Sequence, residues 1–256
     1  MRLAETTWPH VEAYFQKSDM VMIAIGSIEC HGRHLPVGTD YLIPDHLLSL
    51  IEQQNDILIA PTIPYGSCDY FVGFPGSISL GTSLLSSLLE KITDCLYGYG
   101  ARKFVVLNGH GGNMPAIEEV GYRLHGRGAL LAELNWWKMA GQMKSSWVGG
   151  HGGAEETAAV LAINEKLVDA EEKETSNTIS SISSTIRASG LHTQRFQGVD
   201  IVFPRLVSRT SSNGWYGPDQ PLAATKEWGT EMLQAVAGYI GDFLRQFATM
   251  KEDDNA

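Results

Sequence analysis

The sequence predicts an α/β fold: a single domain with a parallel or mixed central sheet flanked by helices on both faces. Short apolar runs of strand length alternate along the chain with stretches in which apolar residues recur at helical spacing. The runs are apolar at successive positions, which is typical of strands buried on both faces. The domain is expected to cover residues 1–249, and residues 250–256 are expected to form a charged, flexible tail.

Four apolar runs are the expected strands of the sheet. They are VMIAI at 21–25, ILIAP at 57–61, KFVVL at 103–107 and ALLAEL at 129–134. Motifs rich in glycine and polar residues directly follow the first and third runs. Ligands of parallel sheets bind at the carboxyl ends of the strands, so these two motifs are expected to meet at one edge.

Helical stretches lie between and after the runs. The expected helices are 45–53, a helix from Thr82 to Gly98, 114–125, a helix that opens near Ala154, and a long amphipathic helix at 221–248. Thr82 is expected to cap the second of them, and Pro221 to mark the start of the last. Eight of the eleven residues at 175–185 are Ser or Thr, so this segment is either a solvated strand or a loop.

The composition limits the classes of partner. A formal net charge of −10 argues against nucleic acid or an anionic membrane, and the longest apolar runs are far shorter than the ~20 residues that span a bilayer. The N-terminus lacks the basic start and apolar core of a signal peptide. The three cysteines show no close pairing and are expected to be free thiols. These features favour a cytoplasmic protein that acts on a small molecule.

Three segments gather side chains that bind metals or transfer protons. The first holds Glu29, His31 and Asp40, the second is the NGHGGN turn around His110, and the third is GHGGAEET with His151. Imidazole and carboxylate groups without a thiol pair suit Zn²⁺, Mn²⁺ or Fe²⁺ in a catalytic rather than a structural site. Glu29 and His31 are two residues apart, so in an extended segment they point to the same side. Asp40 could then bridge two ions.

A fifth ligand is expected from Glu155 or Glu156, at the start of the helix near Ala154. Each segment also has an ordinary alternative: His110 could be a loop histidine, and acidic pairs at a helix start are usually surface charges favoured by the helix dipole. Other chemistries lack their motifs, because the chain has no G-x-S-x-G, no H-E-x-x-H and no complete G-x-G-x-x-G at NGHGGN. The meeting of the segments at one sheet edge favours a catalytic metal site.

The same segments resemble the creatininase (creatinine amidohydrolase) family. GSIECHGRHLPVGTD is similar to the family signature G-S-x-E-Q-H-G-x-H-L-P-x-x-T-D, and GYGARKFVVLNGHGGN to the strand and turn that end in N-G-H-G-G-N. FPGSISL, GGHGGAEETA and NGWYGPDQPLAATKEWG resemble three further family motifs in order. The resemblance runs from about residue 3 to 245. It implies two divalent metal ions per chain (Zn, Mn or Fe) and a ring-like homo-oligomer, with a hexamer as the expected size.

The resemblance also implies a ligand set. One ion would be held by Glu29, Asp40 and His110, and the second by His31, Asp40 and Glu156, with Asp40 bridging the two. Creatininase takes its last ligand from a position that holds Gly112 here. The E-T pair is therefore expected to supply that ligand, and Glu156 is preferred to Glu155.

Substrate contacts follow from the same resemblance. His151 matches a family histidine implicated in substrate contact and proton transfer, and together with Glu156 it is an expected catalytic residue. The expected substrate contacts are Ser67, Gly111, Trp147 and His151. Gly111 stands where creatininase has a Tyr, and Val148 where it has an Asp, which argues against creatinine itself as the substrate.

The resemblance implies hydrolysis of a small polar ring or a small amide. A hydroxide that bridges the two ions would attack a carbonyl carbon, and His151 would protonate the leaving group. Within enzymes, the alternative is hydrolysis of a C–C bond in a cyclic diketone derived from inositol. From another class, the alternative is a non-catalytic small-molecule binding protein built on the same fold.

Neighbouring polar residues are expected to support the site. Asn108 and Asn113 are expected to lock the glycine turn by hydrogen bonds from side chain to backbone. His34 is expected to form hydrogen bonds behind the metal ligands. The thiol of Cys30 is expected to point away from Glu29 and to take no part.

Overall fold

Four parallel strands form the central sheet of the protein, whose computed structural model describes residues 1–173 and 179–250. The strands are β1 (Met20–Ile25), β2 (Leu58–Ile59), β3 (Lys103–Asn108) and β4 (Leu130–Asn135), in the spatial order β2–β1–β3–β4. Ile25 lies opposite Asn108, which in turn lies opposite Asn135. The three long strands therefore end at one edge, and the segments that follow β1 and β3 meet there.

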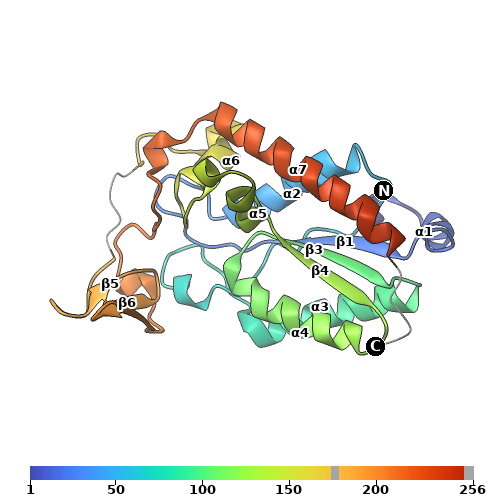
Figure 1. The fold of residues 1–256 in the computed structure, drawn as a ribbon, viewed down its shortest axis with the longest axis horizontal. Coiled ribbons are helices and arrows are strands. Elements are labelled where there is room, and N and C mark those ends of the chain that lie inside the picture. Colours follow the sequence, from blue (N-terminus) through green and yellow to red (C-terminus); the bar gives the residue numbers. More distant parts are fainter. Residues whose placement is uncertain (174–178, 251–256) are drawn as a thin grey trace.

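Helices cover both faces of this sheet, which confirms the predicted fold class (Figure 1). One face is covered by α2 (Thr39–Glu52), α5 (Trp136–Met143), α6 (Ala154–Asn164) and α7 (Lys226–Thr249). The other face is covered by α3 (Gly81–Gly98) and α4 (Met114–His125). Helix α1 (Trp8–Phe15) lies at the end of the sheet. Alternate residues of β1 enter two cores: Met22 packs with α2 and α7, and Ile23 packs with α3 and α4. Since all six residues of β1 are buried, the run has to be apolar at successive positions.

Helix α2 begins at Thr39, six residues before the predicted start at Asp45. The prediction missed the first six residues of the helix, among them Pro44, which lies inside it. Proline donates no hydrogen bond, so the carbonyl group of Asp40 loses its helical partner. Gly109 packs against this carbonyl: a Cβ atom at Gly109 would lie 2.0 Å from the Asp40 oxygen. Gly109, the first glycine of the NGHGGN turn, is thus required for close packing on the first turn of α2.

The starts of two other helices also differ from prediction. Helix α3 begins at Gly81 with no side-chain cap, and the Thr82 hydroxyl instead lies 3.2 Å from Oγ of Ser67. Pro221 opens only a short 3₁₀ turn, Pro221–Ala223. Helix α7 begins at Lys226, because the Thr225 hydroxyl accepts a hydrogen bond from the backbone N–H of Trp228.

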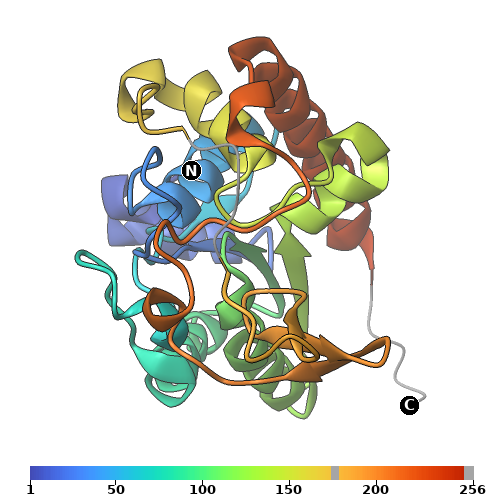
Figure 2. The ribbon, with the colours of Figure 1, turned by 90° about the vertical axis from the view of Figure 1, so that its left-hand side faces the viewer.

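Helices α1 and α5 and a second, antiparallel sheet were not predicted. This sheet has the order β5–β6–β7 and consists of β5 (Arg187–Ala188), β6 (Thr193–Phe196) and β7 (Val199–Val202). Figures 1 and 2 show it beyond the end of the main sheet, as a separate small layer.

Part of the Ser/Thr-rich segment lies within the described residues. Residues 179–185 form neither helix nor strand, whereas 175–178 and the predicted tail at 251–256 lie outside the described residues. Among the described residues, no helix is long and apolar enough to span a membrane.

Candidate metal centre

Side chains from four elements converge at the edge where β1 and β3 end. Glu29 and His31 lie in the loop after β1, His110 follows β3, Asp40 lies in the first turn of α2, and Glu156 in the first turn of α6. Four of these five residues are at most 5% exposed, and Glu156 is partly buried. The structure thus brings together three sequence segments that the sequence analysis expected to meet.

The first group consists of Glu29, Asp40 and His110. Nδ1 of His110 lies 3.2 Å from Oε2 of Glu29 and 3.0 Å from Oδ2 of Asp40. The facing atoms of the three residues all lie within 4.8 Å of one another, close enough to share one ion. Ser27 donates a hydrogen bond of 2.7 Å to Oε2 of Glu29, which holds this carboxylate in place.

The second group shares Asp40 with the first. Nε2 of His31 lies 2.9 Å from Oδ1 of Asp40 and 3.7 Å from Oε2 of Glu156, and these atoms also fall within 4.8 Å of one another. The two oxygens of Asp40 therefore face different histidines. A carboxylate in this position can bridge two cations.

The far nitrogens of His31 and His110 determine which atoms face the carboxylates. Nδ1 of His31 donates to the Glu29 carbonyl at 3.1 Å, and Nε2 of His110 donates to the Ser67 carbonyl at 3.1 Å. A carbonyl only accepts, so these nitrogens carry hydrogen, and the opposite nitrogen of each ring faces carboxylate oxygens. The cluster is therefore arranged to hold positive charge, either as a second proton on each imidazole or as a cation between imidazole and carboxylate.

Two buried carboxylate oxygens strengthen this conclusion. Oε1 of Glu29 and Oδ2 of Asp40 are inaccessible to solvent and accept no hydrogen bond. Unsatisfied buried acceptors are costly, and an ion is a common explanation for them. The donor set of nitrogen and carboxylate oxygen atoms fits a divalent cation such as Zn²⁺ or Mn²⁺.

The pKa values of the cluster reflect its burial and the mutual effects of its carboxylates and imidazoles. Burial raises the pKa of Glu29 and of Glu156 to about 7. Burial would lower the pKa of His110, but Glu29 and Asp40 outweigh it and raise this pKa to about 9. In the same way, Asp40 and Glu156 raise the pKa of His31, and the two histidines hold the pKa of Asp40 below its usual value despite burial.

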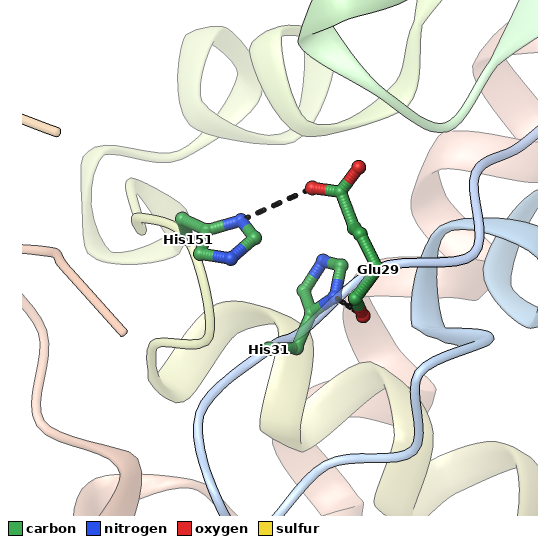
Figure 3. A group of neighbouring side chains, drawn as sticks. All are labelled: Glu29, His31 and His151. Atoms are coloured by element: carbon green, nitrogen blue, oxygen red, sulfur yellow. Dashed lines mark hydrogen bonds and ion pairs between the residues drawn. The ribbon is translucent and has the colours of Figure 1, made fainter. Parts of the chain in front are cut away.

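His151 lies beside these groups with one ring nitrogen toward them (Figure 3). Its Nε2 donates to the Cys30 carbonyl at 2.6 Å, so the Nδ1 atom, 3.8 Å from Oε1 of Glu29, presents a lone pair to the site. The ring stacks on Phe71, with centroids 4.3 Å apart. Burial and the neighbouring His31 lower the pKa of His151 well below its usual value, which keeps the imidazole neutral and able to accept a proton.

The two glutamates at the start of α6 point to different places. Oε2 of Glu156 accepts a hydrogen bond from the backbone N–H of Gly152 and faces His31. Glu155 is turned toward Asp219, and Asp219 accepts a hydrogen bond from the backbone N–H of Glu155 at 2.8 Å. Burial, with Glu156 and Asp219 nearby, raises the pKa of Glu155 to about 9. Glu156 is therefore the one placed to act as a ligand.

Gly112 has no room for the side chain that creatininase carries at the matching position. A Cβ atom there would lie 2.1 Å from the Ser67 carbonyl oxygen and 2.5 Å from Nε2 of His110. A ligand from this turn is thus sterically excluded while His110 is bonded to Ser67.

The two asparagines lock the glycine turn as predicted. Oδ1 of Asn108 accepts a hydrogen bond from the His110 backbone N–H at 3.0 Å. Asn113 accepts from the Ser67 N–H and donates to the Gly26 carbonyl. These bonds tie the loop after β1 and the Ser67 loop to the loop after β3.

The expected substrate contacts differ in their surroundings. Ser67 holds His110 through its backbone carbonyl. Gly111 is exposed, and a Cβ atom there would meet only Trp137, at 3.9 Å. Trp147 is 5% exposed and packs in the core with the residues of α7. Contact of these three residues with substrate stays a prediction.

The remaining residues of the first motif lie behind the site. His34 donates through Nε2 to the Thr157 hydroxyl at 2.9 Å, which confirms a hydrogen bond to the residue next to Glu156. The Cys30 thiol packs with Cys68, Phe71 and Val207 in a separate apolar cluster. It points away from the ligands, as predicted.

A Cys30→Ser variant is expected to keep its metal and its activity. The hydroxyl would be buried among apolar side chains, so the free energy of unfolding should fall by about 1–3 kcal/mol. Metal analysis and thermal denaturation check this, with Cys95→Ser at an exposed position as the control. Loss of metal from the Cys30 variant alone would show that the thiol is a ligand.

Three residues near the site were missed by the sequence analysis. Ser27 belongs to the G-S-x-E motif, so its bond to Glu29 had a signal in the sequence. Asp219 binds the start of α6 from a distant loop. Tyr70, in the 3₁₀ turn Asp69–Phe71, has its ring centroid 6.3 Å from that of His110. Asp219 lies in the stretch NGWYGPDQPLAATKEWG, which resembles a family motif, whereas nothing local in the sequence marks Tyr70.

Fold and site together define an α/β protein with a candidate divalent-metal centre at the carboxyl edge of its sheet. A model of the creatininase family (creatinine amidohydrolase) matches residues 4–244. The chain therefore belongs to the creatininase family.

Relatives in this family have different activities. The chain is 38% identical over 108 residues to a mycofactocin precursor peptide peptidase of Mycolicibacterium smegmatis (38% of this chain, 42% of that protein). It is 28% identical over 190 residues to a creatinine amidohydrolase of Pseudomonas putida (65% and 73%). It is 25% identical over 134 residues to a 3-dehydro-scyllo-inosose hydrolase of Thermotoga maritima (51% and 43%). The matched segments thus span less than half of the first and third relatives.

Solved creatininase structures share the fold. A mutant creatininase of the Zn-Zn type aligns over 97% of this chain and 98% of its own, with a TM-score of 0.76 and 24% identity. A manganese creatininase aligns over 97% and 99%, with a TM-score of 0.74 and 24% identity. At this identity the two structures show the shared fold.

Proposed function

We propose that this chain is a metal-dependent amidohydrolase that cleaves a C–N amide bond in a small molecule with water. The observation that carries the proposal is the pair of buried ligand groups that share Asp40, in which one nitrogen of His31 and one of His110 face carboxylates. Such groups bind positive charge, and two divalent cations, one in each group, would supply it.

The residues that would hold the cations follow from the two groups. Glu29, Asp40 and His110 would hold one, and His31, Asp40 and Glu156 the other. When bound, such cations lower the pKa of a water molecule and polarise a carbonyl oxygen. The near-complete burial of Glu29 and Asp40 excludes bulk water, which strengthens these electrostatic effects.

His151 is placed to move a proton in this reaction. Its Nδ1 atom faces the site, while the Cys30 carbonyl fixes the opposite nitrogen. An uncharged imidazole in this position can accept a proton from water and return it to the leaving nitrogen. The stack on Phe71 holds the ring in the orientation that this transfer needs.

Amide hydrolysis is favoured over C–C hydrolysis by the relatives. The names of two of them, a peptidase and a creatinine amidohydrolase, describe cleavage of C–N bonds, and these two show higher identity than the inosose hydrolase. An amine leaving group also needs a proton donor, a role that His151 can fill. Cytoplasmic location and a homo-oligomer, with a hexamer as the expected size, stay predictions.

Chelation is expected to abolish activity, and about two equivalents of Zn²⁺ or Mn²⁺ per chain should restore it. The assay follows amine or ammonia release from cyclic and linear amides, and acid formation without nitrogen loss from cyclic diketones. Protein dialysed without chelator is the control.

Fully active, metal-free protein would contradict the proposed function. Turnover of diketones alone would support the C–C hydrolase instead. Protein that binds no metal ion and turns over none of these substrates would support a non-catalytic binding protein.

A further inference from the structure

A cavity of about 460 Å³ is lined in part by Tyr70, whose ring lies near that of His110. It is lined by Asp69, Tyr70, His192, Val202, Pro204, Arg205 and Leu206. The lining comes from the turn at Asp69–Phe71, from the small sheet β5–β7 and from the loop after β7. Neither the metal ligands nor the substrate contacts expected from the sequence line it.

Tyr70 connects this cavity to the metal centre. Its ring centroid lies 6.3 Å from that of His110 and 4.1 Å from that of His192, which approaches it at a steep angle. A single side chain therefore separates the cavity from a metal ligand. A molecule that reaches the metal centre along Tyr70 can place its other end in the cavity.

Arg205 gives the cavity a positive charge without a partner. Its Nε atom is buried and has no acceptor, and Nη2 reaches only the Ser180 carbonyl, at 3.3 Å. Within the described part of the chain, Arg205 forms no ion pair. The nearby Asp69 accepts a hydrogen bond from the Ser79 hydroxyl at 2.6 Å. A half-buried guanidinium with a free donor is a ready site for a carboxylate.

The other walls are apolar. Val202, Pro204 and Leu206 supply aliphatic surface, and the side chains of Val202 and Leu206 are 67% and 39% exposed. Ligand sites typically combine such apolar walls with a few polar groups that orient the ligand, in volumes of about 300–1,000 Å³. The cavity lies within this range and is larger than a creatinine-sized ring needs.

We propose that this cavity is a substrate subsite for an apolar group that carries a carboxylate, bound by Arg205 and by the walls of Val202 and Leu206. The proposal rests on the proposed function and narrows its substrate class to small amides that carry an apolar carboxylic acid group several bonds away from the amide that is cleaved. Tyr70 then lies between the carboxylate end in the cavity and the amide bond at the metal centre.

Direct binding tests the subsite without turnover. The probes are N-acetyl derivatives of valine, leucine and phenylalanine and their uncharged carboxamides, titrated into the zinc-loaded protein by calorimetry. At least one free acid is expected to bind saturably, and about 10- to 100-fold more tightly than its carboxamide, as for a lost charge-assisted hydrogen bond. Arg205→Gln should remove this difference.

Matched variants isolate the two parts of the subsite. Arg195→Gln, an exposed arginine of the same small sheet paired with Asp200, is expected to bind the acids as the unmodified protein does. Val202→Asp should weaken the acids at least tenfold, whereas Val199→Asp, on the same strand, 63% exposed and outside the cavity, should not.

Several results would overturn the subsite. They are the absence of saturable binding by any acid, equal affinity for acid and carboxamide, or unchanged affinity in Arg205→Gln protein that folds normally by circular dichroism. Metal content and amide turnover are measured on the same samples. If both persist while the acids fail to bind, the subsite is wrong and the proposed function stands.

Discussion

An Asp40→Asn variant is expected to lose at least one metal ion and nearly all activity. Oδ1 of Asp40 faces His31 and Oδ2 faces His110, so this one carboxylate belongs to both groups. Asparagine keeps the shape but replaces one oxygen by a hydrogen-bond donor and removes the charge. Since bound cations contribute several kcal/mol to such reactions, kcat should fall by about 10³-fold or more.

Elemental analysis of the purified variant, alongside steady-state kinetics, checks this prediction. Asp45→Asn, on the same helix but bonded to the Thr62 hydroxyl, is the control and should keep metal and activity. Circular dichroism establishes that both variants fold. An Asp40 variant with a full complement of metal and ordinary turnover would contradict the bridging role.

A His151→Gln variant is expected to keep its metal but lose about 10²- to 10⁴-fold in kcat, the usual contribution of a general acid or base. His151 lies outside the two groups that share Asp40, yet its Nδ1 faces Glu29 and its ring lies 4.2 Å from that of His31. Glutamine can still donate to the Cys30 carbonyl but cannot carry the proton.

Metal content separates the two roles open to this histidine. Glu29, His31 and His151 also lie close enough together to hold an ion, so a variant that loses metal would identify His151 as a ligand. His46→Gln on α2, away from the site, controls for the general effect of the substitution. Normal turnover in the His151 variant would exclude it from proton transfer.

Much of the fold was predictable because its signals are local. Residues 20–25 are apolar at every position, and a strand buried on both faces requires that pattern. The start of α2 was predicted six residues too late: Pro44 lies inside the helix, and the packing of Gly109 against the Asp40 carbonyl joins segments that are far apart in the sequence. The small sheet escaped prediction because β7 is exposed along its whole length and lacks an alternating pattern.

The candidate site was predictable where residues are close in sequence. Glu29 and His31 share a loop, so a spacing of two places them on one side. The choice of Glu156 over Glu155 followed from family resemblance and stays a prediction, with which the 3.7 Å distance from Oε2 of Glu156 to Nε2 of His31 agrees.

By itself, the sequence determined the class of fold and the chemistry of the site, because periodicity and clustered ligand types are properties of short segments. Only the tertiary structure decided how those segments meet. It placed Asp40 between two histidines and fixed the orientation of both rings through backbone carbonyls. It also set Arg205 and Tyr70 around one cavity. Such contacts between distant residues depend on how helices and loops pack on the sheet, which no local pattern encodes.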